Sequence, residues 1–345
     1  METENLISIV MPVYNSKRFV SMAIESILRQ KMYRYQLILV DDGSTDGSSD
    51  ICDEYAREHQ QIMVIHKKNG GICDARNYGL NLVQAKYVYF MDNDDVLEDD
   101  FFQSLSYILE ENSYDIIMFG TNLTDIVDGC VKSKRKRSLS EFQALSSDEF
   151  KKHIPDILEA GMHLCVWDKL YRTEFLIQNN ACFDTVFTHG GEDLCFNVSL
   201  FPFVKSALNI DKAFYNYYIR DDQSTYRKFN PNVYKHALIN IDNISRMLNQ
   251  MEIEDVDYLY RKYIEYRQRL VLMLLHRNSE MTFSQKSKLC KKEYSEDGYS
   301  LKFKARALMV YLKTENISFR KKFSACLNIL GLYKVQLRIY KKYMR

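Results

Sequence analysis

A chain of 345 residues is long enough for one sizeable hydrophobic core and a smaller appended domain. Its 46% hydrophobic and 27% charged residues are typical of a soluble globular protein, and only 4 prolines and 12 glycines argue against long linkers or low complexity. The net charge of +1 conceals an asymmetry, because residues 1–130 carry 10 Lys and Arg against 22 Asp and Glu, whereas residues 131–345 carry 37 against 24. Either these are two differently charged solvated surfaces, or the acidic part serves metal or hydroxyl chemistry and the basic part binds phosphates or an anionic surface.

The cysteines and the N-terminus bear on the cellular compartment. The 8 cysteines are widely spaced and form no C-x-x-C pair, so neither a zinc site nor a disulfide framework is indicated. The first residues lack the basic region of a signal peptide, and no apolar run approaches the ~18 residues needed to span a bilayer. We therefore expect a cytoplasmic protein.

The first part of the chain alternates short apolar runs with helical segments. Runs typical of buried strands lie at Leu6–Met11, Leu37–Val40, Ile62–Ile65, Tyr87–Met91 and Ile116–Phe119. Helical periodicity follows the first three runs, around Phe19–Ile27, Asp46–Glu58 and Ala75–Val83. This alternation predicts an α/β fold with a mostly parallel sheet flanked by helices. Polar clusters that follow the strands should then gather at one edge of the sheet.

Beyond about residue 220 only helical periodicity remains, as in Val233–Met251 and Tyr258–His276. We therefore expect a sheet-containing domain over residues 1–220 and a small helical C-terminal region over residues 221–345.

The tripeptide Asp92-Asn93-Asp94 directly follows the fourth predicted strand. Two carboxylates separated by one residue can bind a hard divalent cation through oxygen, which favours Mg²⁺ or Mn²⁺. Such a metal would neutralise the charge on a diphosphate leaving group. The alternative is an Asx-rich turn that merely ends the strand.

The acidic stretch after the second strand partly matches a calcium-binding loop. Position 12 of that loop would be Asp53 instead of Glu, and the stretch follows a strand, whereas EF-hand loops join two helices. We therefore reject calcium binding and expect a carboxylate at the strand end to bond to a base or a ribose, while Ser44–Asp46 caps the helix that follows.

Two glycine-containing turns precede predicted helices. The turn before Arg76 lacks both G-x-G-x-x-G and G-K-[ST], so Arg76 is either a phosphate contact or a surface helix arginine. The second turn precedes Glu192 and Asp193, where a carboxylate can accept a proton from an attacking hydroxyl or simply begin a helix. His189 lies close by and is expected to be structural.

Taken together, these segments resemble the family 2 glycosyltransferases, which have the Rossmann-like GT-A fold. The order and spacing match across roughly the first 200 residues, in the stretches Ile7–Asn15, Val40–Asp46, Asn69–Leu80, Tyr87–Asp95, Trp167–Arg172 and Gly191–Asp193.

The resemblance implies how a nucleotide-sugar donor would be bound. Pro12, Tyr14 and Asp42 would hold the nucleotide base, typically uracil, and Arg76 would lie near the donor. Asn93 would belong to the same donor-binding set.

The resemblance also implies a metal and a base. Asp94 would bind the Mn²⁺ or Mg²⁺ ion on the diphosphate, and Asp92 would reach the ribose or the metal. Asp193 would be the general base that deprotonates the acceptor hydroxyl, which gives direct displacement with inversion at the sugar carbon.

The Q-x-x-R-W signature of processive family members is absent, since Leu164-Cys165-Val166 precedes Trp167. Addition of a single sugar to a growing glycan is therefore favoured. Such enzymes commonly build capsule, exopolysaccharide or lipopolysaccharide chains on glycan or lipid-linked saccharide acceptors.

Two basic segments, Lys132–Arg137 and residues 313–345, suggest peripheral contact with the anionic inner face of the cell membrane. The alternative is a solvated loop and tail. Nucleic-acid binding is not expected, because no recognised binding motif accompanies the charge.

Two other functions were considered. A nucleotidyltransferase would carry a glycine-rich phosphate loop with a lysine, and Pro12–Lys17 supplies none. A non-catalytic, sugar-nucleotide-binding assembly partner would not need the acids Asp92, Asp94 and Asp193.

Overall fold

The computed structural model describes residues 5–31, 34–188, 190–220, 233–254, 257–275 and 281–343. Contacts within the chain divide it into two compact units, Met1–Ser224 and Thr225–Arg345. The division falls within residues 221–232, which lie outside the described residues.

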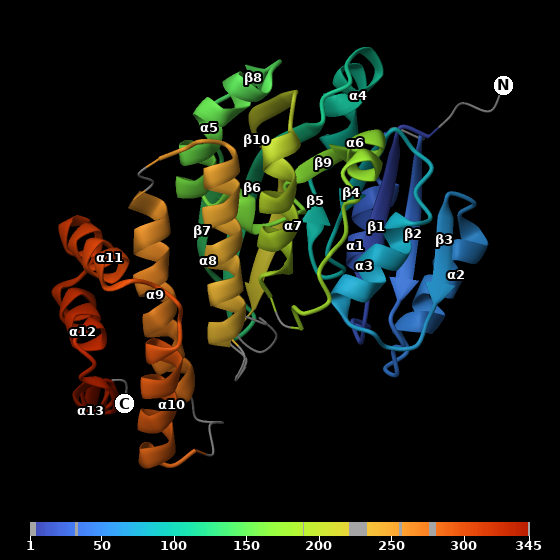
Figure 1. The fold of residues 1–345 in the computed structure, drawn as a ribbon. Coiled ribbons are helices and arrows are strands. Elements are labelled where there is room, and N and C mark those ends of the chain that lie inside the picture. The colour runs from blue at the N-terminus through green and yellow to red at the C-terminus, as the bar shows by residue number, and fades with distance from the viewer. Residues whose placement is uncertain are drawn as a thin grey trace. The chain divides into compact units, whose positions relative to one another are not determined.

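The first unit is built around a sheet (Figure 1). Its strands are β1 (Ile7–Val13), β2 (Tyr35–Asp41), β3 (Ile62–His66), β4 (Tyr87–Phe90), β5 (Val96–Leu97), β6 (Ile116–Val127), β7 (Cys130–Arg137), β8 (Phe142–Ala144), β9 (Lys169–Arg172) and β10 (Ala207–Arg220). Its helices are α1 (Val20–Leu28), α2 (Ser48–Glu58), α3 (Ile72–Leu80), α4 (Phe101–Glu111), α5 (Ser147–Glu159), α6 (Thr173–Gln178) and α7 (Glu192–Leu200), with 3₁₀ turns at Met162–Leu164 and Phe201–Phe203. All five predicted strands are present, so the α/β class is confirmed.

The sheet has the strand order β3-β2-β1-β4-β9-β6-β10-β5, with β7 beside β6 and β8 beside β10. The strands β3, β2, β1 and β4 are parallel, as predicted. The sheet as a whole is mixed, because β9 runs antiparallel to both β4 and β6, and β5, β7 and β8 also pair in antiparallel fashion. Strand β9 was not predicted, because its sequence begins and ends with basic residues and so lacks an apolar run.

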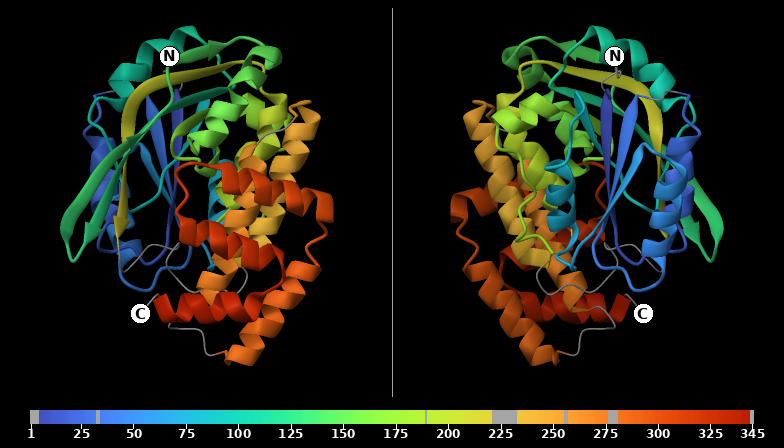
Figure 2. Two further views of the ribbon diagram at one scale, coloured as in Figure 1. Left: turned by 90° about the vertical axis from the view of Figure 1, so that its left-hand side faces the viewer. Right: turned by 90° about the vertical axis from the view of Figure 1, so that its right-hand side faces the viewer.

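Strand β1 is buried on both faces, which explains its uninterrupted apolar run. Its odd-numbered residues, such as Ile9, belong to the core cluster with α1, α2 and α4. Its even-numbered residues face α3, where a Cβ at Gly79 would collide with Val10. The right-hand view of Figure 2 shows α2 and α3 on opposite sides of these strands. This three-layer packing fixes the strand ends that carry the polar clusters.

The basic run Lys132–Arg137 lies in strand β7, which pairs with β6, so it is not the solvated loop that one reading of the sequence expected. A β-hairpin forms here because Asp128 and Gly129 both adopt positive φ and turn the chain.

The second unit is helical. It contains α8 (Val233–Gln250), α9 (Asp257–Leu274), α10 (Phe283–Ser295), α11 (Leu301–Lys313), α12 (Phe319–Ile329) and α13 (Tyr333–Tyr343). A core cluster joins α9, α10 and α13 through residues that include Val271, Tyr294 and Leu337. Both predicted helical stretches are helices, although His276 lies outside the described residues. Among the described residues no helix is both long enough and apolar enough to cross a membrane.

Candidate active site

The carboxyl ends of β1 and β4 meet at one edge of the sheet and are joined by Asn93. Its side-chain amide donates a hydrogen bond to the carbonyl oxygen of Pro12 at 2.6 Å. Pro12 is buried, whereas Tyr14, two residues further, is 52% exposed. Asn93 therefore links the two strand ends, and the ring of Tyr14 lies exposed beside them.

The loop that carries Tyr14 is fixed to the loop that follows β2. The side-chain oxygen of Asn15 accepts a hydrogen bond from the N–H of Thr45 at 2.8 Å, and Asp46 accepts one from the N–H of Lys17 at 3.0 Å. These links hold the two strand-end loops in one rigid arrangement.

Asp42, at the end of β2, is buried and holds the turn before α3. Its carboxylate accepts hydrogen bonds from the N–H groups of Gly70 at 2.9 Å and Gly71 at 2.8 Å, and it pairs with Lys67 at 2.5 Å. Gly71 has φ of +89°, a conformation that favours glycine. Asp42 thus positions the glycine turn, and its contact with a nucleotide base stays a prediction.

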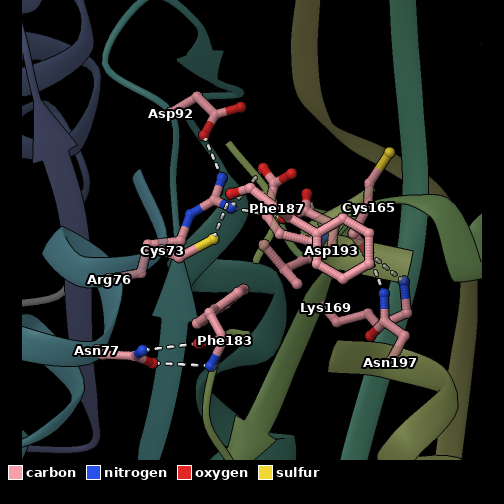
Figure 3. A network of polar contacts seen from close by, with 12 residues as sticks. Cys73, Arg76, Asn77, Asp92, Cys165, Lys169, Phe183, Phe187, Asp193 and Asn197 are labelled. Atoms are coloured by element: carbon pink, nitrogen blue, oxygen red, sulfur yellow. Dashed lines mark hydrogen bonds and ion pairs between the residues drawn. The ribbon is translucent and has the colours of Figure 1, made fainter. Parts of the chain in front are cut away.

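Arg76, in the first turns of α3, is the centre of a buried ionic network (Figure 3). Its guanidinium lies 2.8 Å from Asp92, 2.5 Å from Asp193 and 3.3 Å from Glu192. Its face also lies 5.2 Å from the centre of the Phe183 ring. Because Arg76 is only 1% exposed, it is not the surface helix arginine that one reading allowed.

The network leaves one guanidinium to neutralise three carboxylates. Burial, together with the charges of Glu192 and Asp92, raises the pKa of Asp193 to about 7, against the opposing effect of Arg76. Burial would lower the pKa of Arg76, but the three carboxylates raise it further, so the guanidinium stays charged. The raised pKa of Asp193 is what a general base that works near neutral pH would need, and its role as the base stays a prediction.

A set of buried polar groups orients Asp193. The N–H of Val166 donates to its second carboxylate oxygen at 3.3 Å. The segment that carries Val166 is held by Asn197, whose amide donates to the carbonyl oxygens of His163 at 3.0 Å and Cys165 at 2.8 Å. Asn197 also accepts a hydrogen bond from the hydroxyl of Tyr171 at 2.6 Å.

Asp94 lies in a more open setting than Asp193. Its side chain is 37% exposed and pairs with Arg220 at 3.2 Å, at the end of β10. Burial and the charge of Asp92 raise its pKa to about 6, and Arg220 opposes this. Arg220 also lies over the ring of Phe19, with its guanidinium carbon 4.3 Å from the ring centre.

Asp95, the next residue, is fully buried and anchors this turn to β10. It accepts a hydrogen bond from the hydroxyl of Tyr215 at 2.8 Å and another from the N–H of Tyr218 at 2.9 Å. Burial and the charges of Asp94 and Asp92 raise its pKa.

The acids at the end of β4 suit a divalent cation that is completed by a ligand. In the described ranges no group of three or more His, Cys, Asp or Glu side chains is arranged to hold a metal by itself. Mg²⁺ in nucleotide sites commonly takes only one or two protein carboxylates and completes its shell with phosphate oxygens and water. Asp92 and Asp94 fit this pattern, because both side chains are partly exposed and the charge of Asp92, after burial, helps to raise the pKa of Asp94, an effect that a bound cation would oppose.

The structure brings Arg76, Asp92 and Asp193 together and places Asp94 two residues away on the same turn. Asp42, Pro12 and Tyr14 lie on the neighbouring strand ends. Their roles toward a ligand stay predictions.

No role was predicted for Arg220, and Glu192 shared its expected role as proton acceptor with Asp193 until the family resemblance assigned that role to Asp193 alone. Glu192 was visible beside Asp193, and the pairing with Arg76 is what gives it importance. Arg220 pairs with Asp94 across 126 positions of sequence, and no local pattern signals that contact. His189 lies outside the described residues.

Comparison with known proteins identifies the family. Residues 8–169 match the family described as Glycosyl transferase family 2. The chain is 31% identical over 239 residues to EpsJ, an uncharacterized glycosyltransferase of Bacillus subtilis (strain 168), covering 67% of this chain and 66% of that relative. The chain thus spans just under two thirds of the length of that relative.

Two solved structures have the same fold. The crystal structure of S. aureus TarS in complex with UDP-GlcNAc aligns with a TM-score of 0.67 and 17% identity, over 98% of this chain and 92% of that chain. The mannosyltransferase PcManGT from Pyrobaculum calidifontis, in complex with GDP-Man and Mn²⁺, aligns with a TM-score of 0.53 and 12% identity, over 100% and 89%. The chain therefore belongs to the family 2 glycosyltransferases and has the GT-A fold.

Proposed function

We propose that this protein transfers a single sugar from a nucleotide-sugar, a UDP-sugar in particular, to a hydroxyl group of a growing glycan, with inversion at the sugar carbon. One observation carries the proposal: Asp193, with its pKa raised to about 7, is joined through Arg76 to Asp92 at the end of β4. The UDP-GlcNAc held by TarS supports the choice of donor.

In the proposed reaction Asp193 takes the proton of the acceptor hydroxyl as its oxygen attacks the anomeric carbon. The bond between that carbon and the phosphate oxygen breaks, and the nucleoside diphosphate departs with the bonding electron pair. Attack from the face opposite the leaving group gives inversion. Arg76 keeps the carboxylate of Asp193 aligned, and the Val166 N–H fixes its second oxygen, so the base is held in place before the acceptor arrives.

Asp94 and Asp92 are the residues that would hold a Mn²⁺ or Mg²⁺ ion together with the diphosphate. The ion would supply positive charge to the leaving group. Asp94 pairs with Arg220 in this structure. When the ion binds, Asp94 would either contact both Arg220 and the ion or lose its contact with Arg220. The Mn²⁺ bound by PcManGT supports this choice of ion.

We further propose that the acceptor is a glycan or a lipid-linked saccharide in capsule, exopolysaccharide or lipopolysaccharide biosynthesis. The enzyme would then work in the cytoplasm at the inner face of the cell membrane. Residues 1–220 would form the nucleotide-sugar domain, and residues 221–345 would dock on the acceptor or on the membrane surface.

The second unit supports membrane contact through its charge and exposed apolar side chains. Residues 301–343 contain 11 Lys and Arg against one Glu. Phe319 is 81% and Leu330 69% exposed, and the rings of Phe319 and Phe323 stack with centres 6.4 Å apart on α12. Apolar side chains flanked by cations are suited to an anionic bilayer surface.

A donor screen tests the proposed function. Hydrolysis or transfer is measured for UDP- and GDP-sugars with Mn²⁺ and then with EDTA. We expect turnover of at least one UDP-sugar that EDTA abolishes and added Mn²⁺ restores. Turnover that survives chelation would refute the metal assignment, and no turnover of any donor would refute the transferase assignment.

A further inference from the structure

The part of the sheet formed by β6, β7 and β10 carries a polar hollow that the proposed mechanism does not use. Its volume is about 540 Å³. Two cross-strand rows of paired residues line it, namely Lys136, Asn122 and Asn216 in one row and Lys134, Thr124 and Tyr218 in the next. Paired residues of neighbouring strands share a face, and so do residues two apart, so these six side chains lie together.

The cations that border the hollow differ in whether they are already paired. Lys136 lies 2.7 Å from Asp211, and Arg135 lies 2.7 Å from Asp125. Lys134 is exposed and has no ion pair or hydrogen bond within the described part of the chain. Of the three cations that line the hollow, Lys134 is therefore the one whose charge is not paired with an acid of the described residues, while Glu98 contributes a carboxylate to the lining.

The uncharged side chains that line the hollow make only some of the hydrogen bonds that they could make. The amide of Asn122 donates to Glu98 at 3.0 Å and to the side-chain oxygen of Asn216 at 3.1 Å. Glu98 also lines the hollow and keeps its negative charge on the side of Asn122 and Asn216, in the row of paired residues next to that of Lys134. The hydroxyls of Thr124 and Tyr218 have no hydrogen-bond partner in the ranges that the structure describes. An aromatic ring with free hydroxyl groups and amides beside it suits the mixed apolar and polar surface of a sugar.

Strand direction places this hollow at the edge of the sheet that holds the donor acids. Strand β9 is antiparallel to both β4 and β6, so β6 and β10 run in the same direction as β4. Near the end of β10, the N–H of Tyr218 binds Asp95, and Arg220 binds Asp94 and lies 5.0 Å from the Tyr218 ring centre. The left-hand view of Figure 2 shows the β6–β7 hairpin, in green, extending beyond the sheet.

We propose that the hollow binds a negatively charged unit of the acceptor glycan, with Lys134 on its carboxylate or phosphate and Tyr218 against its sugar ring. This assignment rests on the proposed function, because it gives the hollow to the acceptor. The acceptor is then an anionic saccharide, and Lys134 is a residue that determines specificity for it.

Binding by the full chain is measured by titration calorimetry with saturating UDP present. The probes are trigalacturonate, which carries carboxylates, a glycerol-phosphate trimer, which carries phosphates, and neutral maltotriose. Lys134→Glu should weaken binding of at least one anionic probe by about tenfold or more, since a charge-assisted hydrogen bond becomes a repulsion. Lys132→Glu is the matched control, because it makes the same charge change on the same exposed strand outside the hollow, and it should change affinity less than about twofold.

Tyr218→Phe, which removes only the hydroxyl, should weaken the same probe by a few fold. The probe that responds to Lys134 tells whether the anionic group is a carboxylate or a phosphate. Equal effects of Lys134→Glu and Lys132→Glu, equally tight binding of maltotriose, or no binding of either anionic trimer would overturn the proposal.

UDP binding in the same samples separates the two proposals. If UDP fails to bind, the proposed donor chemistry is wrong, and the two lysine variants still test the hollow. If UDP binds and the lysine variants behave alike, only the anionic-acceptor site is wrong.

Discussion

Asp193 and Asp94 are carboxylates of one site, and both have raised pKa values, but their surroundings differ. Asp193 is buried and shares the Arg76 guanidinium with two other acids, whereas Asp94 is 37% exposed at its side chain and faces Arg220 alone. The first arrangement would hold in one position a group that gains and loses a proton, as the proposed base must. The second leaves a carboxylate that a cation from solution can reach. The difference teaches how the surroundings of two carboxylates on one sheet edge could suit one of them to the proposed role of base and the other to the proposed role of metal ligand.

Replacement of Asp193 by Asn is expected to have the largest effect. The amide keeps the shape but cannot accept the proton, so transfer should fall by about 10²–10⁴-fold while UDP affinity changes less than about twofold. Steady-state transfer and UDP titration measure the two quantities. Asp184→Asn, an exposed change a few residues earlier, is the control, and unchanged turnover of the Asp193 variant would remove it as the base.

Arg76→Met tests whether the buried cluster depends on its one cation. Loss of Arg76 leaves three acids without a counter-charge, so the free energy of unfolding should fall by about 3–5 kcal/mol. Denaturant unfolding measures it, with the exposed Arg57→Met expected to change stability by about 0.5 kcal/mol or less. A loss below about 1 kcal/mol for Arg76→Met would show that the cluster is not the tightly coupled unit described above.

Most of the sheet edge was predictable, because its first strands are apolar runs, of which the second and fourth lead into acids and the third into a glycine turn. The partners of those acids were not. Arg220 reaches Asp94 from the far end of the sheet, after β9 has inserted in antiparallel fashion between β4 and β6. Such pairing depends on tertiary packing, which leaves no periodic signal in a single sequence. Likewise, the burial of Arg76 depends on Asp193 approaching from 117 positions away.

Asp94→Asn tests whether the partly exposed carboxylate of Asp94 is a metal ligand. A lost carboxylate ligand should raise the Mn²⁺ concentration needed for half-maximal transfer by about tenfold or more. Asp99→Asn, a nearby and more exposed acid, should leave that concentration within about twofold. An unchanged Mn²⁺ requirement in the Asp94 variant would assign the metal elsewhere.

The smallest expected effect is on membrane binding by the second unit, which is basic, whereas the first part of the chain is acidic. Replacing both Phe319 and Phe323 by Ser should reduce binding to vesicles containing anionic lipid by up to about tenfold, because two exposed rings no longer insert. Liposome sedimentation measures this, and Phe203→Ser in the first unit is the control. Binding that is absent, insensitive to salt or equal in all three proteins would contradict membrane docking.

The pH dependence of kcat/KM for transfer, which reports ionisations of the free enzyme, tests the role of Asp193 most directly. Protonated Asp193 cannot accept the hydroxyl proton, so kcat/KM should fall as pH drops through about 7, and more steeply below about 6, where Asp94 is protonated as well. A kcat/KM that stays constant from pH 8 down to pH 5 would contradict Asp193 as a buried base with a raised pKa.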